Sequence, residues 1–426
     1  MERAKNRIQT TMNKLKTVQF CTILFVFLSV ILTACQPKNP LQMILSSPTK
    51  EIAAIVENID AHHVQIRYTQ IHRDTLGQPQ FRSYEYGVDE ERYFYPASTA
   101  KLPVAILALQ RLRELQRKGV AIDAQTPFLI RSPFSDHPMV ESDSTHPQHR
   151  LTVAHLIKKI FLVSDNDAYN YLFDFLGRDY INDQLREKGL NQIQIHHKFL
   201  WGADNERTWE YLFYDATGTV YEQASMRSIF AQTNAHLKGV RQGNGFIKEG
   251  NLVTEPMDFR QKNRLSIRAL EGLMKRVLFP EVFPAHQRFD LTEEDHVFLR
   301  YWMGRHTLES SSPKYSAEAG FYDSYVKFLM YGDTPGKMTP DIRIYNKVGD
   351  AYGTLTDTAY IVDAKAEIEF LLTATVFVNK NGIFNDDVYE YDALGIPFLG
   401  ALGRQVYAWE KKTKSMYSSG EALQKK

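Results

Sequence analysis

Ser98-Thr99-Ala100-Lys101 is the stretch of this chain that is most informative about its fold and its chemistry. It is followed by apolar residues at helical spacing: Leu102, Ala105, Ile106, Leu109 and Leu112. This pattern predicts a helix that begins here and ends near Lys118 and Gly119. Because positions i and i+3 of a helix are neighbours on one face, the Lys101 amine is expected beside the Ser98 hydroxyl. A partly buried lysine with a lowered pKa can take the proton of a serine and make it a nucleophile.

The motif alone does not identify a catalytic site. Ser-x-x-Lys also begins at Ser47, Ser311 and Ser324, and the alternative for residues 98–101 is an ordinary helix start with a solvated lysine. Two motifs further along the chain favour the catalytic interpretation.

A polar triplet, Ser164-Asp165-Asn166, interrupts an otherwise apolar helical region. Residues 151–163 predict a helix that begins after Thr152, a favourable N-cap, and residues 168–176 predict a second helix. The triplet either forms a polar turn that faces a cleft or is an ordinary turn, since Ser, Asp and Asn are common turn residues.

Lys347-Val348-Gly349 lies in a region of predicted strands. Residues 343–347, 354–362 and 368–378 are rich in Thr, Ile, Val and aromatic residues and are separated by short turns. Lys-x-Gly also occurs elsewhere in the chain, so the setting rather than the triplet is informative. A lysine beside a glycine on an edge strand suits a substrate that docks along that edge.

In this order the three motifs resemble the signature set of class A β-lactamases and penicillin-binding proteins. The similarity extends to their surroundings, over residues 94–101, 151–166 and 347–361, and the resemblance covers the chain from about residue 50 to 412. The chain looks most like the divergent β-lactamase-like serine hydrolase lipoproteins of the Bacteroidetes kind.

The resemblance implies an acyl-enzyme mechanism that needs no cofactor. Ser98 would attack an amide carbonyl, Lys101 would act as its base or relay, and Ser164 would pass a proton to the leaving nitrogen. Asn166 would hold the side-chain amide of the substrate. Lys347 would lower the proton affinity of Ser164 and add positive charge near the substrate.

The resemblance also places an oxyanion hole at two backbone N–H groups, those of Ser98 and Asp350, and Gly349 beside the substrate. The Lys-Thr-Gly of the family reads Lys-Val-Gly here. Val348 cannot donate the hydrogen bond by which the threonine helps to hold a substrate carboxylate, and Asp350 adds a negative charge nearby. Recognition of a carboxylate would therefore need compensation from Lys347 or Arg343.

A second departure concerns removal of the acyl group. Class A enzymes use a glutamate after Ser-Asp-Asn to activate the deacylating water, and the family's Glu-x-x-Leu-Asn pattern is absent here. Asp204, Glu206 and Glu210 lie in roughly the right region, without the flanking sequence, and surface charge on a loop is the alternative for all three. Without such a base, deacylation is expected to be slow.

The motifs together predict a serine hydrolase acting on a small-molecule or peptide amide, such as a β-lactam. The alternatives are a D,D-carboxypeptidase or another peptidase acting on cell-wall peptides, and a slowly deacylating or inactive protein of the penicillin-binding type. The intact serines and lysines argue against a pure binding module. Val348 and the missing glutamate argue against an efficient β-lactamase.

The composition is that of an ordinary soluble globular protein. The chain has 426 residues, of which 43% are hydrophobic and 24% charged. A net charge of +1 gives no indication of nucleic-acid binding. The adjacent histidines His62-His63 and His196-His197 would point apart on a strand, and no cysteine cluster accompanies them, so no metal site is predicted.

The N-terminus resembles a secretion signal. Basic residues precede an apolar run, residues 18–32, which leads into Leu-Thr-Ala followed by Cys35. This is similar to a bacterial lipobox, so residues 1–34 are predicted to be a signal peptide and Cys35 to carry lipid that anchors the chain to a membrane of the cell envelope. A single transmembrane anchor is the alternative, but the run is short for a span. The other cysteine, Cys21, would be removed with the signal, leaving no disulfide.

The predicted fold class is α/β (α+β), similar to β-lactamases and D,D-peptidases. Residues 35–50 are expected to be the lipidated cysteine and a tether, 51–412 a single hydrolase domain, and 413–426 a polar tail. Strands from both ends of the domain are expected to form one antiparallel sheet flanked by helices. A large all-helical lobe, about residues 102–340, would be inserted between them, with the site between the lobes.

Overall fold

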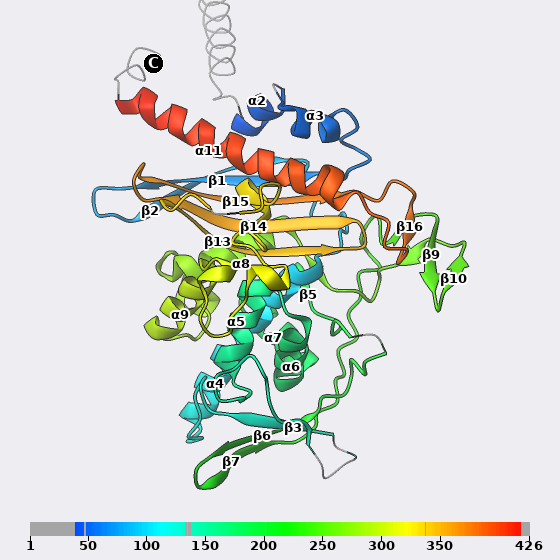
Figure 1. Ribbon diagram of the computed structural model, residues 1–426, viewed down its shortest axis with the longest axis vertical. Coiled ribbons are helices and arrows are strands. Elements are labelled where there is room, and N and C mark those ends of the chain that lie inside the picture. The colour runs from blue at the N-terminus through cyan, green and yellow to red at the C-terminus, as the bar shows by residue number, and fades with distance from the viewer. Residues whose placement is uncertain are drawn as a thin grey trace, which may run out of the picture.

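The computed structural model describes residues 39–46, 48–132, 134, 138–200, 202–336 and 338–418 (Figure 1). The predicted signal peptide, Cys35 and residues 419–426 of the predicted tail lie outside this part. Among the described residues, no helix has the length and the apolar composition needed to cross a bilayer.

The central element is a five-stranded antiparallel sheet in the order β13-β14-β15-β1-β2. Its strands are β1 (Gln65–Arg73), β2 (Pro79–Tyr86), β13 (Ile342–Ala351), β14 (Thr354–Asp363) and β15 (Ile368–Phe377). Because β1 pairs with β15, strands from the two ends of the domain lie side by side, which confirms the predicted sheet. β13 is an edge strand, so alternate backbone groups along it point away from the sheet.

Threonines on one face join β14 to β15. Thr356 lies opposite Thr375 and Thr358 opposite Thr373, and each pair shares a hydroxyl hydrogen bond of 2.8 Å. Cross-strand pairs of this kind stabilise a sheet. Successive side chains of a strand alternate between faces, so Asp357 lies on the opposite face.

One face of the sheet is covered by helices from both ends of the chain, namely α2 (Pro40–Ser46), α3 (Lys50–Val56) and α11 (Ile396–Ser418) (Figure 1). Residues 40–46, expected to belong to a tether, instead form a helix. Its Leu41, Ile44 and Leu45 are buried in the core that α11 and the sheet share. At the other end, the helix continues to Ser418, past residue 413 where the tail was expected.

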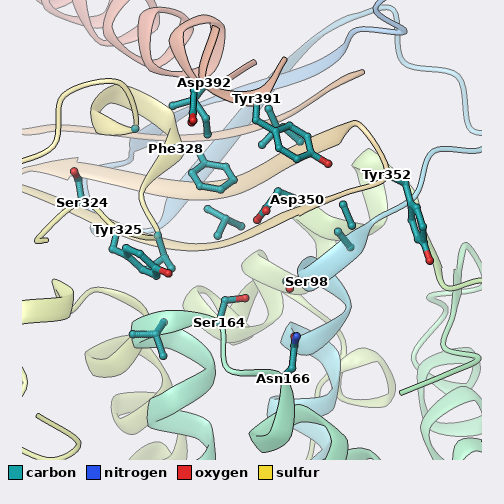
Figure 2. Close-up of a pocket in the computed structure, with 18 of the residues that line it drawn as sticks. Ser98, Ser164, Asn166, Ser324, Tyr325, Phe328, Asp350, Tyr352, Tyr391 and Asp392 are labelled. Atoms are coloured by element: carbon teal, nitrogen blue, oxygen red, sulfur yellow. The ribbon is translucent and has the colours of Figure 1, made fainter. Parts of the chain in front are cut away.

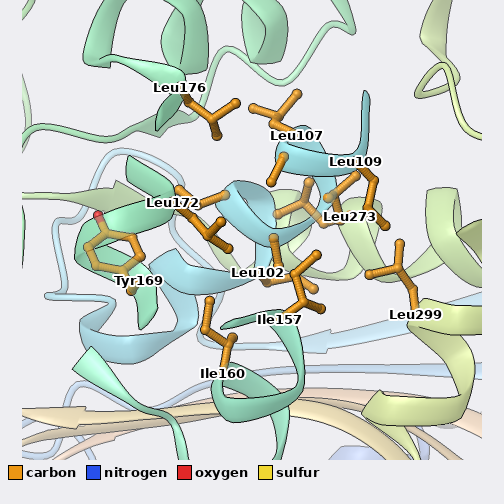
Figure 3. Packing of buried hydrophobic residues seen from close by; sticks show 14 of the residues in the cluster. Leu102, Leu107, Leu109, Ile157, Ile160, Tyr169, Leu172, Leu176, Leu273 and Leu299 are labelled. Carbon is orange, nitrogen blue, oxygen red and sulfur yellow. The ribbon is translucent and has the colours of Figure 1, made fainter. Parts of the chain in front are cut away.

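The other face of the sheet carries a helical lobe centred on α4 (Lys101–Arg117) (Figure 1). Around it lie α5 (Val153–Val163), α6 (Asn166–Leu176), α7 (Arg178–Glu187), α8 (Ile267–Leu278) and α9 (Glu293–Met303). The first half of α4 is buried on all sides, as is typical of a helix in the middle of a core. Figure 3 shows Leu102, Leu107 and Leu109 of α4 among side chains from the neighbouring helices.

The predicted fold class is confirmed, but the prediction that the lobe is all-helical is wrong. A four-stranded sheet consists of β4 (Pro138–Val140), β3 (Phe128–Arg131), β6 (Glu210–Asp215) and β7 (Gly218–Gln223), in that order. Tyr211 and Phe213 are buried and alternate with less buried residues, and a turn at Ala216 and Thr217 closes the hairpin. This period-2 pattern was not recognised in the sequence.

Shorter elements complete the described part of the fold. The remaining strands are β5 (Ile193–Gln194), β8 (Arg241–Gln242), β9 (Gly245–Lys248), β10 (Asn251–Val253), β11 (Met257–Asp258), β12 (Arg264–Leu265) and β16 (Ile383–Phe384). A short helix, α10 (Phe328–Tyr331), packs on α11, and a single wide helical turn, Tyr391–Gly395, leads into α11.

Candidate active site

Ser98 lies in a 3₁₀ turn, Ala97–Ala100, that leads directly into α4. Ala97 has a φ of +46°, in the left-handed region that residues with a side chain rarely adopt, and the Thr99 hydroxyl donates to the Pro96 carbonyl at 2.6 Å. Backbone strain of this kind is found where the surrounding structure fixes a functional residue. The serine therefore occupies a constrained turn at the N-terminal end of the central helix, as the sequence predicted.

Gly349 allows β13 to approach this turn. A Cβ atom built at Gly349 would lie 2.6 Å from the Pro96 carbonyl oxygen and 2.7 Å from the backbone nitrogen of Ser98. These distances are shorter than any normal contact, so only glycine fits between the strand and the turn.

Ser164-Asp165-Asn166 joins α5 to α6 in a tight turn. Ser164 adopts the left-handed conformation at the end of α5 (φ 58°, ψ 39°), and Asp165 caps α6 by accepting a hydrogen bond from the Ala168 N–H at 2.8 Å. Asp165 also pairs with Lys159 at 3.4 Å. Its contacts are those of a residue that braces the turn and leaves its two neighbours to face the cleft.

The three motifs meet at the hydroxyl of Ser164. Lys347 Nζ donates to this oxygen at 2.8 Å, and Lys101 Nζ lies 3.4 Å from it. Lys101 also donates to the Ser164 carbonyl and to Asn166 Oδ1, the latter at 2.6 Å. The described residues include no hydrogen-bond partner for the Ser98 hydroxyl, so its expected bond to Lys101 is not formed here.

Burial sets the charge of the two lysines. Lys101 is 0% exposed and Lys347 is 2% exposed. Removal from water lowers the pKa of Lys101 to about 7, against partial compensation from nearby aspartates such as Asp165 and Asp350. The same desolvation, reinforced by the charge of Lys101, holds the pKa of Lys347 well below its usual range. A neutral amine, which can accept a proton, is therefore available near neutral pH.

Ser98, Ser164 and Asn166 line one pocket of about 530 Å³ (Figure 2). Val348 and Asp350 of β13 line it as well, together with residues 324–326 and the turn before α11 that carries Tyr391 and Asp392. Lys101 and Lys347 do not line the pocket but lie beneath its surface.

Arg343 does not reach this pocket. Its guanidinium donates to both carboxylate oxygens of Glu309, at 2.8 and 2.9 Å, near the start of β13. The compensating role suggested for it in binding a substrate carboxylate is therefore not supported by its position.

None of the three carboxylates considered for deacylation lines the pocket. Asp204 accepts hydrogen bonds from backbone N–H groups of its own loop, at 2.9 and 3.0 Å. Glu206 is exposed and lies 3.8 Å from Arg227, while Glu210 on β6 pairs with Arg131 at 2.7 Å. Asp204 and Glu206 thus have the contacts of loop charges, whereas Glu210 is a paired strand residue.

The side chain that faces Lys101 is aromatic, that of Phe199, and not one of these carboxylates. It lines the pocket, and the centre of its ring lies 5.1 Å from Lys101 Nζ. Its backbone N–H donates to Asn170 Oδ1 at 2.7 Å, and the adjacent Lys198 forms a buried ion pair with Asp174 at 2.9 Å. Helix α6 thus fixes an aromatic side chain over the candidate base. The sequence contained no signal for this contact, which depends on packing alone.

A buried polar network behind the pocket was also missed. Lys327 Nζ donates to Asn346 Oδ1 at 2.6 Å, to the Ile344 carbonyl at 2.9 Å and to that of Met303 at 2.8 Å. Asn346 in turn donates to Asp357 at 2.9 Å. The signal was present in the sequence, as a lysine and an aspartate within two otherwise apolar or threonine-rich segments.

The network fixes one wall of the pocket. Asn346 donates to the Val326 carbonyl at 2.8 Å, and Asp357 accepts from the Leu329 N–H at 3.0 Å. Residues 326–329 are thereby attached to β13 and β14. Among the described residues as a whole, no group of three or more His, Cys, Asp or Glu residues is placed to hold a metal ion.

The chain is similar to known proteins at two levels. The model of the family described as "Beta-lactamase enzyme family" matches residues 47–283. Comparison with curated proteins finds no match.

Solved structures that resemble it include three at 14–16% sequence identity. L2 in complex with relebactam is 14% identical, with 86% of this chain and 97% of that chain covered and a TM-score of 0.46. A β-lactamase from Xanthomonas campestris pv. campestris is 16% identical (80% and 91% covered, TM-score 0.44). The β-lactamase from Streptomyces albus G is 15% identical (82% and 96% covered, TM-score 0.45). Because the family model matches more than half of its length, the chain belongs to the beta-lactamase enzyme family.

Proposed function

We propose that the chain is a serine hydrolase that opens an amide bond of the β-lactam kind through an acyl-Ser98 intermediate. The observation that carries the proposal is the position of the Ser164 hydroxyl, 2.8 Å from Lys347 and 3.4 Å from Lys101, in the pocket that Ser98 lines. Cleavage of an amide needs a base for the nucleophile and an acid for the leaving nitrogen. The two lysines and the second serine supply both.

In this mechanism a proton moves from Ser98 to Lys101, and a proton from Lys101 later replaces the one that Ser164 gives up. The Ser98 hydroxyl transfers its proton to neutral Lys101 as its oxygen attacks the carbonyl carbon. Backbone N–H groups of Ser98 and Asp350 stabilise the resulting oxyanion. Ser164 gives its proton to the leaving nitrogen as the carbon–nitrogen bond breaks, and Lys101 then restores the proton of Ser164 across the 3.4 Å contact.

We further propose that the acyl-enzyme is long-lived. The carboxylates among the described residues that line the pocket are Asp350 and Asp392, on β13 and before α11, whereas the side chain that faces Lys101 is Phe199. A water molecule over Lys101 would therefore lack the carboxylate base that class A enzymes use. Behaviour of the penicillin-binding kind, or turnover of a cell-wall peptide by a D,D-peptidase, is favoured over rapid hydrolysis of β-lactams.

An intact-mass time course with benzylpenicillin tests this function. The protein lacking residues 1–34 is expected to gain one lasting penicilloyl adduct, and Ser98→Ala is expected to gain none. Ser324→Ala is a matched control, because Ser324 also begins a Ser-x-x-Lys motif and lines the same pocket; this variant should still acylate.

The outcomes separate the candidates. Rapid consumption of penicillin that requires Ser98, with only a transient adduct, would identify an efficient β-lactamase with a base other than those considered. A lasting adduct together with turnover of a D-Ala-D-Ala peptide would identify a peptidase. If wild type gained no adduct and consumed no drug, the proposed acylation by β-lactams would be rejected.

The proposal includes a location. We propose that the chain is exported and anchored to a membrane of the cell envelope through lipid on Cys35. The support is the Leu-Thr-Ala-Cys sequence after an apolar run, which resembles a lipobox.

A further inference from the structure

The charges that line the pocket are negative. Among its described lining residues, the charged ones are Asp350 and Asp392, and none is a lysine, arginine or histidine. Lys101 and Lys347 lie beneath the surface with their amines bonded to Ser164. A substrate therefore meets two carboxylates before it meets any cation.

Asp350 has no partner of its own. The described residues contain no hydrogen bond or ion pair to its carboxylate, and Figure 2 shows it projecting from β13 toward the middle of the pocket. The residue is exposed to the solvent of the pocket, and partial desolvation by the surrounding side chains raises the pKa of its carboxyl, against the opposing charges of Lys347 and Lys101. An exposed carboxylate that lines a pocket and has no partner among the described residues is available to a cation brought by a ligand.

The rest of the pocket lining includes aromatic and polar side chains. Tyr322, Tyr325, Tyr352 and Tyr391 line the same pocket, and the faces of such rings attract ammonium and guanidinium groups. Ser324 lines it too, is only 1% exposed, and its hydroxyl has no hydrogen-bond partner. Besides the tyrosine rings and the two carboxylates, the pocket therefore offers the Ser324 hydroxyl as a hydrogen-bond acceptor that is not in use.

The position of Asp350 identifies the part of the substrate it meets. Val348 and Asp350 are two residues apart on β13 and therefore share a face. Ser164, which would protonate the leaving atom, lines the same pocket as these two residues. The leaving portion of a substrate would consequently lie along Val348 and Asp350.

We infer that this pocket selects substrates whose leaving portion carries a positive charge, an ammonium or guanidinium group, with Asp350 as the residue that determines this preference. The inference rests on the proposed acyl-Ser98 chemistry and names its substrate class. It reverses the recognition of a carboxylate that the resemblance to β-lactamases implies.

Three matched thioesters test the inference on the full-length chain. All carry a phenylacetyl group; the leaving thiols are thiocholine, its uncharged carbon isostere 3,3-dimethylbutanethiol, and thioglycolate. Ser98 forms an ester with the acyl carbon, and the sulfur departs as the thiol with the proton that Ser98 gave up. Thiol release and the mass of the acyl-enzyme report the rate of acylation.

Acylation by the thiocholine ester is expected to be about tenfold or more faster than acylation by the neutral isostere, with the thioglycolate ester slowest. Asp350→Asn should reduce the ratio of thiocholine to isostere severalfold or more, and Asp392→Asn should reduce it less. Asp341→Asn removes the same charge from an exposed position 3.9 Å from Lys365, outside the pocket lining, and should keep the wild-type ratio.

Other results overturn the inference. Equal rates for the three esters, or thioglycolate fastest, would do so, and so would a preference that survives Asp350→Asn unchanged. Binding of the same esters to Ser98→Ala, measured by calorimetry, separates this from failure of the proposed function. If wild type is not acylated but the thiocholine ester binds Ser98→Ala most tightly, the hydrolase is rejected and the cation preference stands. If wild type is acylated without that order, the cation preference alone is rejected.

Discussion

At the scale of single residues, Lys101 connects burial to a measurable pH dependence. Its amine has no exposure to solvent, and desolvation lowers its pKa to about 7. Only the neutral amine accepts the proton of Ser98, so the rate of acylation should rise with pH through about 7 and level off above it. Adduct formation measured by mass spectrometry between pH 5 and 9 checks this expectation.

The variant Lys101→Arg tests whether this pH dependence comes from Lys101. Arginine stays protonated throughout this range and cannot act as a base. It should therefore acylate about 100-fold or more slowly and lose the rise near neutral pH. A wild-type rate that does not change between pH 5 and 9 would show that Lys101 is not the base.

Gly349→Ala tests the close approach of β13 to the nucleophile turn. The new Cβ would lie 2.7 Å from the backbone nitrogen of Ser98, so the strand or the turn must move. A displacement of about 1 Å can cost about 100-fold in rate, and we expect a loss of acylation of that order. Stability should fall by about 1–3 kcal/mol.

Gly272→Ala provides the control for this substitution. Gly272 lies in α8, where a Cβ would lie 3.2 Å from the end of the Arg276 side chain and 3.7 Å, an ordinary contact distance, from Leu190. Urea unfolding should show a stability close to that of wild type, and acylation should be retained. If Gly349→Ala acylates as fast as this control, the contact is not needed to position Ser98.

At the scale of elements, the buried Lys327 and Asp357, which are connected through Asn346, hold one wall of the pocket to the sheet. Lys327→Met or Asp357→Leu alone leaves a buried charge without its network and should cost about 3–5 kcal/mol of unfolding free energy. The double variant should cost less than the sum of the two, because neither charge is then left behind. Urea unfolding of the four proteins measures the coupling.

The exposed pair of Lys238 and Glu91 is the comparison for that cycle. These side chains lie 2.9 Å apart and are 62% and 74% exposed, so their coupling should be at most about 1 kcal/mol. If the buried pair shows no more coupling than this one, residues 326–329 are held by apolar packing instead.

Elements with a local hydrophobic pattern could be predicted from the sequence. Strands β13–β15 and helices α4–α6 were predicted because each has a local period of 2 or 3.6 that does not depend on distant residues. The contact of Lys347 with Ser164, which the resemblance implied, also forms, whereas the expected bond of Lys101 to Ser98 does not. The β6–β7 hairpin had a readable pattern that was not recognised.

Other parts depend on contacts between distant segments. Phe199 over Lys101 and the Tyr391 turn beside β13 have no local signature, since each is placed by packing of segments far apart in the chain. Asp350 was noted as a nearby charge, but only the assembled pocket shows that no cation lines it in the described structure.

At the scale of the whole molecule, helix α2 sets how an anchored chain would face a membrane. The described structure begins at Asn39, and α2 packs with α11 on the face of the sheet opposite the helical lobe (Figure 1). Four residue steps separate Cys35 from Asn39 and span at most about 14 Å when extended. Lipid on Cys35 would therefore hold the end of the molecule that carries α2 close to the bilayer.

This arrangement makes the proposed anchor testable. Acyl chains contribute about 0.8 kcal/mol per buried methylene, so the wild-type chain should sediment with membranes and incorporate radiolabelled palmitate. Cys35→Ser should lose the label and enter the soluble fraction, or retain its signal peptide. The serine variant lacking residues 1–34 separates these two cases, because without a signal it should be soluble and should still be acylated at Ser98 by penicillin. Since α2 belongs to the folded core, removal of the lipid should change the location of the protein and leave the pocket intact.

Palmitate incorporation that persists in Cys35→Ser would place the lipid elsewhere and reject the lipobox interpretation.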